Sequence, residues 1–149
     1  MIIDARTEFQ IRSAAITGTV GAQMCTNSID LGDSQIVPGL RVVVVIDALP
    51  GSVGHAATVK FDVVTAASDA GLSAGSVVAT TGAIAEAALT AGRMLSIPLN
   101  SAGTLGRYLG LRYTVGTEDI TSGGTFSAYL SSVLNPVSRA GGGNYADGV

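Results

Sequence analysis

Charged residues are scarce in this sequence. They make up 13% of its 149 residues, whereas about 25% is usual for globular proteins. A surface with so few charges consists largely of Ser, Thr, Gly and Ala, and covering it with a partner costs little desolvation energy. The composition therefore favours a protein that its neighbours partly cover, with a soluble monomer of unusually neutral surface as the alternative.

Positive charge is neither abundant nor clustered. The formal net charge is −3, and the eight basic residues are scattered, with Lys60 as the single lysine. Nucleic-acid binding needs a clustered basic stripe, so direct binding to DNA or RNA is not expected. No run of about 18 apolar residues occurs, so no membrane-spanning helix is expected. Residues 1–6 lack the basic-then-apolar pattern of a signal peptide, which predicts synthesis and use in the cytoplasm of the producing cell.

Residues that bind metals or act as nucleophiles are also few. Cys25 is the only cysteine and His55 the only histidine. This predicts no internal disulfide and leaves too few ligands for a metal site built from Cys and His. A catalytic Cys–His pair stays open, although a small apolar cysteine and a loop histidine are the ordinary interpretation. No calcium loop or phosphate loop occurs, so no catalytic site, metal or cofactor is expected.

The sequence does contain a series of short β-branched runs that are bounded by Gly, Pro, Asn, Asp or Ser. Such runs are typical of strands between turns. Arg41–Ile46 gives the strongest prediction, because four consecutive valines are unfavourable in a helix and favourable in a sheet. Its unbroken apolar character predicts cover on both faces. The predicted strands comprise residues 15–20, 28–31, 41–46, 58–66, 76–81, 94–98, 107–115 and 125–134.

These strands predict an all-β fold, a jelly-roll-like β-sandwich of about seven or eight strands with long Gly-rich loops and little helix. The last two strands alternate clearly and predict a pair, joined by an exposed hairpin loop over residues 116–124. Residues 83–89 are rich in alanine and could form one or two helical turns. The predicted organisation is an N-terminal arm or edge strand (1–14), a β-sandwich domain (15–135) and a Gly-rich C-terminal tail (136–149).

Several segments occur in an order that resembles a known family. They are Met1–Asp4, Ala15–Thr19, Thr26–Gly32, Ile97-Pro98 and Arg107–Val115. Over residues 1–135 this order is similar to that of the capsid cement, or decoration, proteins of tailed bacteriophages, typified by that of a Bordetella short-tailed phage. The Arg-Tyr-Leu-Gly-Leu-Arg-Tyr strand that begins at Arg107 carries most of the resemblance.

The resemblance implies a jelly-roll-like fold on the outside of an icosahedral capsid. It also implies self-association and docking across major capsid protein subunits, so that the capsomers hold together against the pressure of the packaged DNA. The sequence departs from the family pattern at Thr117–Ile120 and in the Gly-rich tail after Asn135. Both departures bear on how the chain contacts its neighbours.

Candidate contact residues come from four segments. Residues 1–11 could form an arm that reaches a neighbouring subunit, or an edge strand that packs on its own domain. In 107–115, alternation directs Leu109, Leu111 and Tyr113 to the core and Tyr108 and Arg112 to the exposed face. There the Tyr and Arg could bind a partner, or lie at the rim and pair within their own sheet. The acidic pair in the 116–124 loop could meet basic groups of a neighbour or be simply solvated. The candidate contacts are Ile2, Ile3, Phe9, Ile11, Tyr108, Arg112, Glu118, Asp119 and, in the tail, Tyr145.

The functional prediction is a non-enzymatic structural protein on the capsid exterior of a virion, which binds the major capsid protein and copies of itself. A dimer is favoured over a trimer because two-fold contacts are the commonest. The alternative is a non-catalytic carbohydrate- or surface-binding β module of a phage tail or bacterial surface. The chain has no tryptophan and four tyrosines, so platforms for sugar stacking are scarce. A cupin-type enzyme would need several metal-binding histidines.

Overall fold

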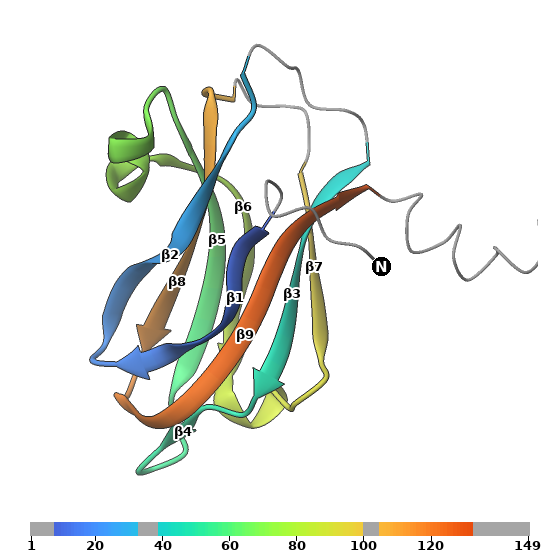
Figure 1. Cartoon of the computed structure of the whole chain (residues 1–149). Coiled ribbons are helices and arrows are strands. Elements are labelled where there is room, and N and C mark those ends of the chain that lie inside the picture. Colours follow the sequence, from blue (N-terminus) through green and yellow to red (C-terminus); the bar gives the residue numbers. More distant parts are fainter. Residues whose placement is uncertain (1–7, 33–38, 100–104, 133–149) are drawn as a thin grey trace, which may run out of the picture.

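The computed structural model describes residues 8–32, 39–99 and 105–132. These residues form two antiparallel sheets that pack face to face as a β-sandwich with almost no helix (Figure 1), which confirms the predicted fold class. Sheet A has the strand order β1-β9-β3-β7 with β4 beside β9, and sheet B has the order β2-β8-β5-β6. The strands of sheet A are β1 (Glu8–Gly18), β9 (Ile120–Ser132), β3 (Leu40–Ala48), β7 (Met94–Pro98) and the two-residue β4 (Gly51–Ser52). Those of sheet B are β2 (Gly21–Asp30), β8 (Tyr108–Gly116), β5 (Thr58–Ala66) and β6 (Ser76–Ala85).

The strand pairs are nested along the chain. The first long strand, β1, pairs with the last, β9, then β2 pairs with β8, β3 with β7, and β5 with β6. The chain therefore resembles one long hairpin, both arms of which cross repeatedly between the sheets. Eight principal strands in two sheets with this order form a jelly roll, as the sequence predicted.

Local sequence patterns located the strands well. The strands β5 and β7 begin and end at the predicted residues, whereas β1, β2 and β9 begin earlier than predicted, at Glu8, Gly21 and Ile120. The missed part of β2 has few β-branched residues, and the ladder with β8 holds it in the sheet. The predicted cover on both faces of β3 is found at one position. Val43 lies on the outer face of this strand and is buried, as its inward neighbours are.

One local prediction was wrong, and another was confirmed only in part. The strands β8 and β9 do not form a hairpin, because they belong to different sheets and the turn between them crosses the sandwich. Alternation shows that a strand has one apolar face, but it does not identify the neighbouring strand. Of the Ala-rich residues 83–89, the first three extend β6, and the helical part is a single 3-10 turn, η3 (Glu86–Ala88).

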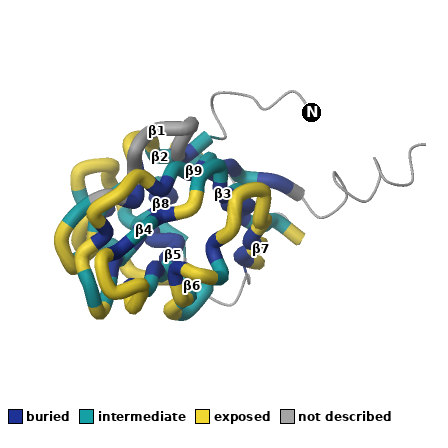
Figure 2. The backbone as a smooth tube through the Cα atoms, turned by 90° about the horizontal axis from the view of Figure 1, so that it is seen from below, coloured by how far each residue is buried: buried dark blue, intermediate teal, exposed yellow. Residues whose placement is uncertain are grey.

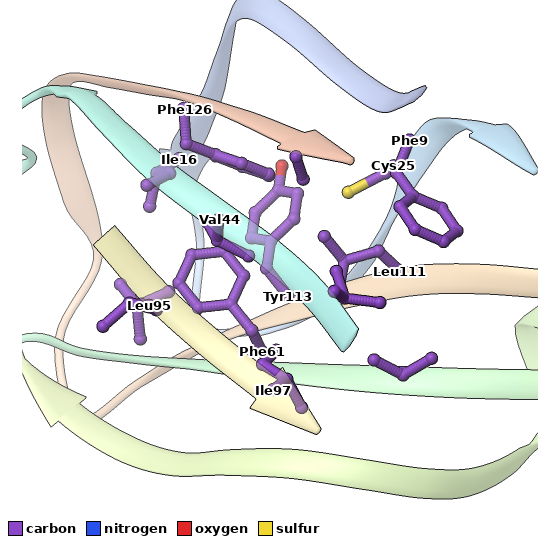
Figure 3. Close-up of a cluster of buried hydrophobic side chains, with 14 of the residues drawn as sticks. Phe9, Ile16, Cys25, Val44, Phe61, Leu95, Ile97, Leu111, Tyr113 and Phe126 are labelled. Atoms are coloured by element: carbon purple, nitrogen blue, oxygen red, sulfur yellow. The ribbon is translucent and has the colours of Figure 1, made fainter. Parts of the chain in front are cut away.

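The core lies between the sheets and is centred on three aromatic rings (Figure 3). Phe126 of sheet A meets Phe61 and Tyr113 of sheet B edge to face, with ring centroids 5.1 Å and 5.7 Å apart. Such contacts stabilise by about 0.5–1.5 kcal/mol beyond the burial of area. The hydroxyl of Tyr113 donates a hydrogen bond of 2.7 Å to Oε1 of Gln23, so its polar atom is satisfied.

A short 3-10 segment covers part of the outer face of sheet B. In this segment, η2 (Asp69–Ala74), Leu72 is buried. Gly110 leaves room for this packing, because a Cβ there would lie 2.9 Å from Met24 Cε and 3.2 Å from Leu72 Cδ1, and both side chains would have to shift. Val64, which lies on this outer side of β5, is fully buried as a result.

The edge strands of the described sheets all depart from a flat ladder. β6 carries two register shifts against β5, and β2 carries one against β8, between Met24 and Ser28. The register of β1 shifts at every step along β9, and β7 has five residues and ends at Pro98. Bulges, short strands and proline are devices that keep an edge from pairing with another strand. The sandwich therefore offers no long, flat edge within its described residues.

One end of the sandwich is formed by four connections, all of them described. They are the β1–β2 turn, the β3–β5 connection with β4, the β6–β7 connection with η3, and the β8–β9 turn. This end, at the bottom of Figure 1 and facing the viewer in Figure 2, is called the turn end below. It comprises residues 19–20, 49–57, 86–93 and 117–119.

Truncation of the central ring tests the role of the core. In the variant Phe126→Ala, both edge-to-face contacts are lost and a cavity remains between the sheets, so the free energy of unfolding should fall by about 3–5 kcal/mol. Urea denaturation measures this change. The control Val77→Ala, at an exposed position of β6, should change it by about 0.5 kcal/mol or less. A similar loss in both variants would contradict the central role of Phe126.

Candidate contact surface

The acidic pair of the β8–β9 turn connects three of the loops at the turn end. Glu118 accepts hydrogen bonds from the backbone N–H groups of Gly54 (2.7 Å) and Ala56 (3.1 Å). Asp119 accepts one from the N–H of Val20 (2.7 Å). Both carboxylates therefore hold neighbouring turns in place, a role that the sequence did not indicate. Because amide donors are neutral, both groups keep their negative charge at the surface.

The backbone donors also stabilise the ionised form of Glu118. The N–H groups of Gly54 and Ala56 hold the pKa of this carboxyl below its ordinary value of 4.5. Hydrogen bonds that favour the charged form of an acid have this effect. The turn is consequently held most firmly when Glu118 is ionised.

A second carboxylate ties η3 to the β4–β5 connection. Glu86 is nearly completely buried, and its Oε2 accepts a hydrogen bond of 2.6 Å from the Ser52 hydroxyl. His55 Nδ1 lies 2.9 Å from Oε1. Burial opposes the charge of Glu86, but the hydrogen bonds from Ser52 and His55 outweigh it and hold the pKa below its ordinary value. Sequence reasoning missed this residue, although a lone carboxylate in an Ala-rich run was a signal that it needs partners.

The Ser–Glu–His cluster does not have the geometry of a hydrolase triad. In a triad the histidine contacts the serine and the acid orients the histidine. Here Ser52 and His55 both contact the acid, and Ser52 is buried. The cluster therefore fixes loops instead of presenting a nucleophile.

Strained backbone is concentrated at the same end. Among the described residues other than glycine, only His55 (φ 56°) and Thr117 (φ 71°) have a positive φ. Such conformations cost about 1–3 kcal/mol each and persist where the surroundings enforce them. Hydrogen bonds of Glu86 and Glu118 hold these two conformations. Glu86 bonds to His55 itself, and Glu118, which follows Thr117, bonds to the N–H of Gly54.

Exposed apolar side chains also gather at the turn end. Within the described residues, the large hydrophobic side chains that are exposed are Val20, Leu49, Val53, Val77 and Met94. Three of them lie in the turns of this end: Val20 (53% exposed), Leu49 (52%) and Val53 (81%). These three residues are called the apolar rim below. Figure 2 shows how exposed this end of the chain is.

Arg112 pairs within its own sheet, which was one of the two interpretations of this residue. Its guanidinium lies 3.4 Å from Asp62 Oδ2, and Lys60 Nζ lies 3.1 Å from the same oxygen. Burial disfavours the charge of Asp62, but hydrogen bonds from Thr80, Lys60 and Arg112 outweigh it and hold its pKa below the ordinary value. Arg112 is thus part of a polar network on the outer face of sheet B.

Tyr108 is half-buried at the opposite end of sheet B from the turn end. The guanidinium of Arg107 lies over its ring at 5.4 Å and donates two hydrogen bonds, of 2.9 Å and 2.8 Å, to the carboxylate of Asp30. The hydrogen bonds from Arg107, and that from the N–H of Gly32, lower the pKa of Asp30 to about 2. This group stabilises the junction of β2 and β8, and it covers one face of the tyrosine.

The N-terminal candidates are divided between the core and residues outside the described part. Phe9 is fully buried in the core and Ile11 lies in β1, an edge strand of sheet A. Of the two interpretations of residues 1–11, the edge strand is the one found from Glu8 onward. Ile2, Ile3 and Tyr145 lie outside the described residues, as does the tail from 136.

Cys25 and His55 do not form a catalytic pair. Cys25 is buried in the core, where burial raises the pKa of its thiol to about 12, whereas His55 lies at the turn end with Glu86. Within the described residues, no three His, Cys, Asp or Glu side chains group to hold a metal ion. Nor does this part of the chain contain a helix long and apolar enough to cross a membrane.

Comparison with known protein families finds a match that spans most of the chain. The family model of Bbp16 matches residues 12–130, which include all strands from β2 to β8 and most of β1 and β9. Bbp16 is a capsid cement protein of Bordetella phage BPP-1. A search of curated proteins finds no match.

Removal of Asp62 tests the outer-face network. In Asp62→Ala the largely buried guanidinium of Arg112 loses its carboxylate partner, so the free energy of unfolding should fall by about 1–3 kcal/mol. In the control Lys60→Ala, Arg112 and Asp62 still pair, and the loss should stay below about 1 kcal/mol. Urea denaturation of both variants gives the comparison. An equal effect of the two substitutions would argue against a special role of Asp62.

The pH dependence of stability tests the role of Glu118. A carboxyl with a lowered pKa in the folded state stabilises the protein fully above its ordinary value, here 4.5, and loses this contribution as the pH falls through the folded pKa. Between pH 7 and about pH 3 the thermal midpoint of the Glu118→Gln variant should therefore fall less steeply than that of the wild type. The control Val77→Ser, which changes an exposed residue outside the turn end and no titratable group, should follow the wild type. Parallel curves for all three proteins would refute the assignment.

Proposed function

Because the chain belongs to the Bbp16 family of phage capsid cement proteins, we propose that it binds the outside of its capsid and stabilises the contacts between major capsid protein subunits. The match over residues 12–130 carries this proposal, since it includes nearly the whole sandwich. Membership of this family identifies the chain as a structural protein of a phage virion.

The physical properties of the chain suit such a role. A cement protein needs many moderate contacts that symmetry repeats, rather than one deep cleft. An interface of about 1,600 Å² suffices for stable binding, and repetition over a capsid increases the effective affinity through avidity. With charged residues at 13% of the chain, each contact costs little desolvation energy. The nested pairing of the jelly roll holds both sheets as one rigid support for these contacts.

Self-association is part of the proposal, with a two-fold dimer as the favoured form. The bulged and shortened edges of both sheets argue against contact by strand addition. Copies of the chain would therefore meet through faces or ends of the sandwich. This type of contact leaves the hydrogen-bond ladders of each copy unchanged.

The carbohydrate-binding alternative gains no support from the described residues. Sugar recognition commonly uses exposed aromatic rings. Tyr108, which is half-buried, has Arg107 over its ring. The other described aromatic residues, all buried, are Phe9, Phe61, Tyr113, Phe126 and Tyr129.

Co-sedimentation with capsids tests the proposed function. The purified protein should bind capsids that have been stripped of their decoration layer, saturably and at a fixed ratio to the major capsid protein. Capsids that retain the layer are the control and should take up little more, because their sites are filled. A protein that stays in the supernatant with stripped capsids at every concentration would overturn the proposal.

A further inference from the structure

We propose that the turn end is the surface with which the protein docks on the major capsid protein. The occupant that fits this surface is an apolar patch of the major capsid protein that is bordered by basic side chains. The inference rests on the proposed capsid binding and specifies which part of the sandwich performs it.

The apolar rim supplies the first argument. Val20 comes from the β1–β2 turn, Leu49 and Val53 come from the β3–β5 connection, and all three side chains lie more than half in solvent. In a protein with few charged residues, exposed apolar side chains that collect at one end mark a binding surface. Val20 and Val53 flank the β8–β9 turn, because the N–H of Val20 is bound by Asp119 and that of Gly54, next to Val53, by Glu118.

The rigidity of the turn end supplies the second argument. Glu118, Asp119 and Glu86 fix its turns to one another through hydrogen bonds to backbone and side-chain donors. Two strained residues are held in place there as well. A surface that is already ordered loses little entropy when it binds, which is the advantage of preorganisation. Two of the side chains that enforce this order bind the backbone at or next to the apolar rim, Asp119 at Val20 and Glu118 at Gly54, which follows Val53.

Charge at the turn end defines the chemistry of the partner. Glu118 and Asp119 accept hydrogen bonds from neutral backbone amide groups, and His55 lies near enough to attract the Glu118 carboxylate when it is protonated. The only arginine or lysine in the turn-end connections is Arg93, which donates a hydrogen bond to the carbonyl of Ala88. With Glu86, Glu118 and Asp119 against Arg93, and His55 neutral, the turn-end connections carry a net negative formal charge around the apolar rim. Basic side chains around an apolar patch of the partner would complement it.

Other described surfaces fit a partner less well. The outer face of sheet B is occupied by the Lys60–Asp62–Arg112 network and by η2. At the opposite end, Asp30 and Arg107 neutralise each other. Val77, an exposed valine on β6 (47%), lies at the end of that strand farthest from the turn end. It provides a matched control for the apolar rim.

Variants of exposed valines test the proposal. In Val20→Ser/Val53→Ser the affinity for stripped capsids should fall about tenfold or more, because apolar contact at a binding hot spot is lost. The single variant Val53→Ser should show a smaller loss. Val77→Ser should bind as the wild type does. Thermal unfolding followed by circular dichroism verifies that each variant is folded, which is expected because the substituted side chains are exposed.

The outcomes separate this inference from the proposed function. Wild-type binding that neither rim variant weakens would overturn the docking surface and leave the cement function in place. An equal loss in the rim variants and in Val77→Ser would also overturn it, since the effect would not be specific to the turn end. Wild-type binding should weaken as salt is raised from about 50 mM to about 500 mM; binding that salt does not affect would overturn the basic character of the partner surface. Absence of wild-type binding would remove the cement function and this inference together.

Discussion

The arrangement of the strands and turns depends on the contact between the inner faces of the two sheets. Phe126 lies in the middle of sheet A, and it meets Phe61 and Tyr113 from the two central strands of sheet B. The chain has no tryptophan and three phenylalanines, so the remaining core consists mainly of Val, Ile and Leu from alternating strand positions. Once this contact fixes the register of the central strands, the nested pairing follows outward to the edges. The positions of the strand ends then bring the turns close to one another.

Several carboxylates of the chain bind other parts of the structure instead of facing only solvent. On most soluble proteins, acids keep the surface hydrated. Here Glu118 and Asp119 bind the backbone of other turns, Glu86 is buried between η3 and β4, and Asp62 organises two cations. Apart from the Lys60–Asp62 pair within β5, each of these bonds joins segments that are distant in sequence. The acids therefore act as connectors between loops, and Ser, Thr and small apolar residues make up much of the exposed surface.

The sequence predicted what depends on neighbouring residues, and missed what depends on distant ones. The alternation in 58–66 identified β5 to the residue, the short run 94–98 that ends at Pro98 identified β7, and the valine run identified β3. The pairing of β8 with β5 and β2, instead of β9, depends on the whole chain and has no local signature. The same holds at the candidate surface. Alternation placed Arg112 on the outer face correctly, but its pairing with Asp62, and the bonds of Glu118 and Asp119, connect residues that only the fold brings together.

The bulges and the proline at the sheet edges affect how free copies of the chain interact with one another. The chain has little net charge to keep its copies apart. The edge strand β6 has no charged residue, and a flat ladder at this edge would be a template for growth into fibres. The register shifts of β6 interrupt that template without adding a single charge. The sandwich thus disfavours edge-to-edge pairing of its copies and still keeps a surface with few charged residues.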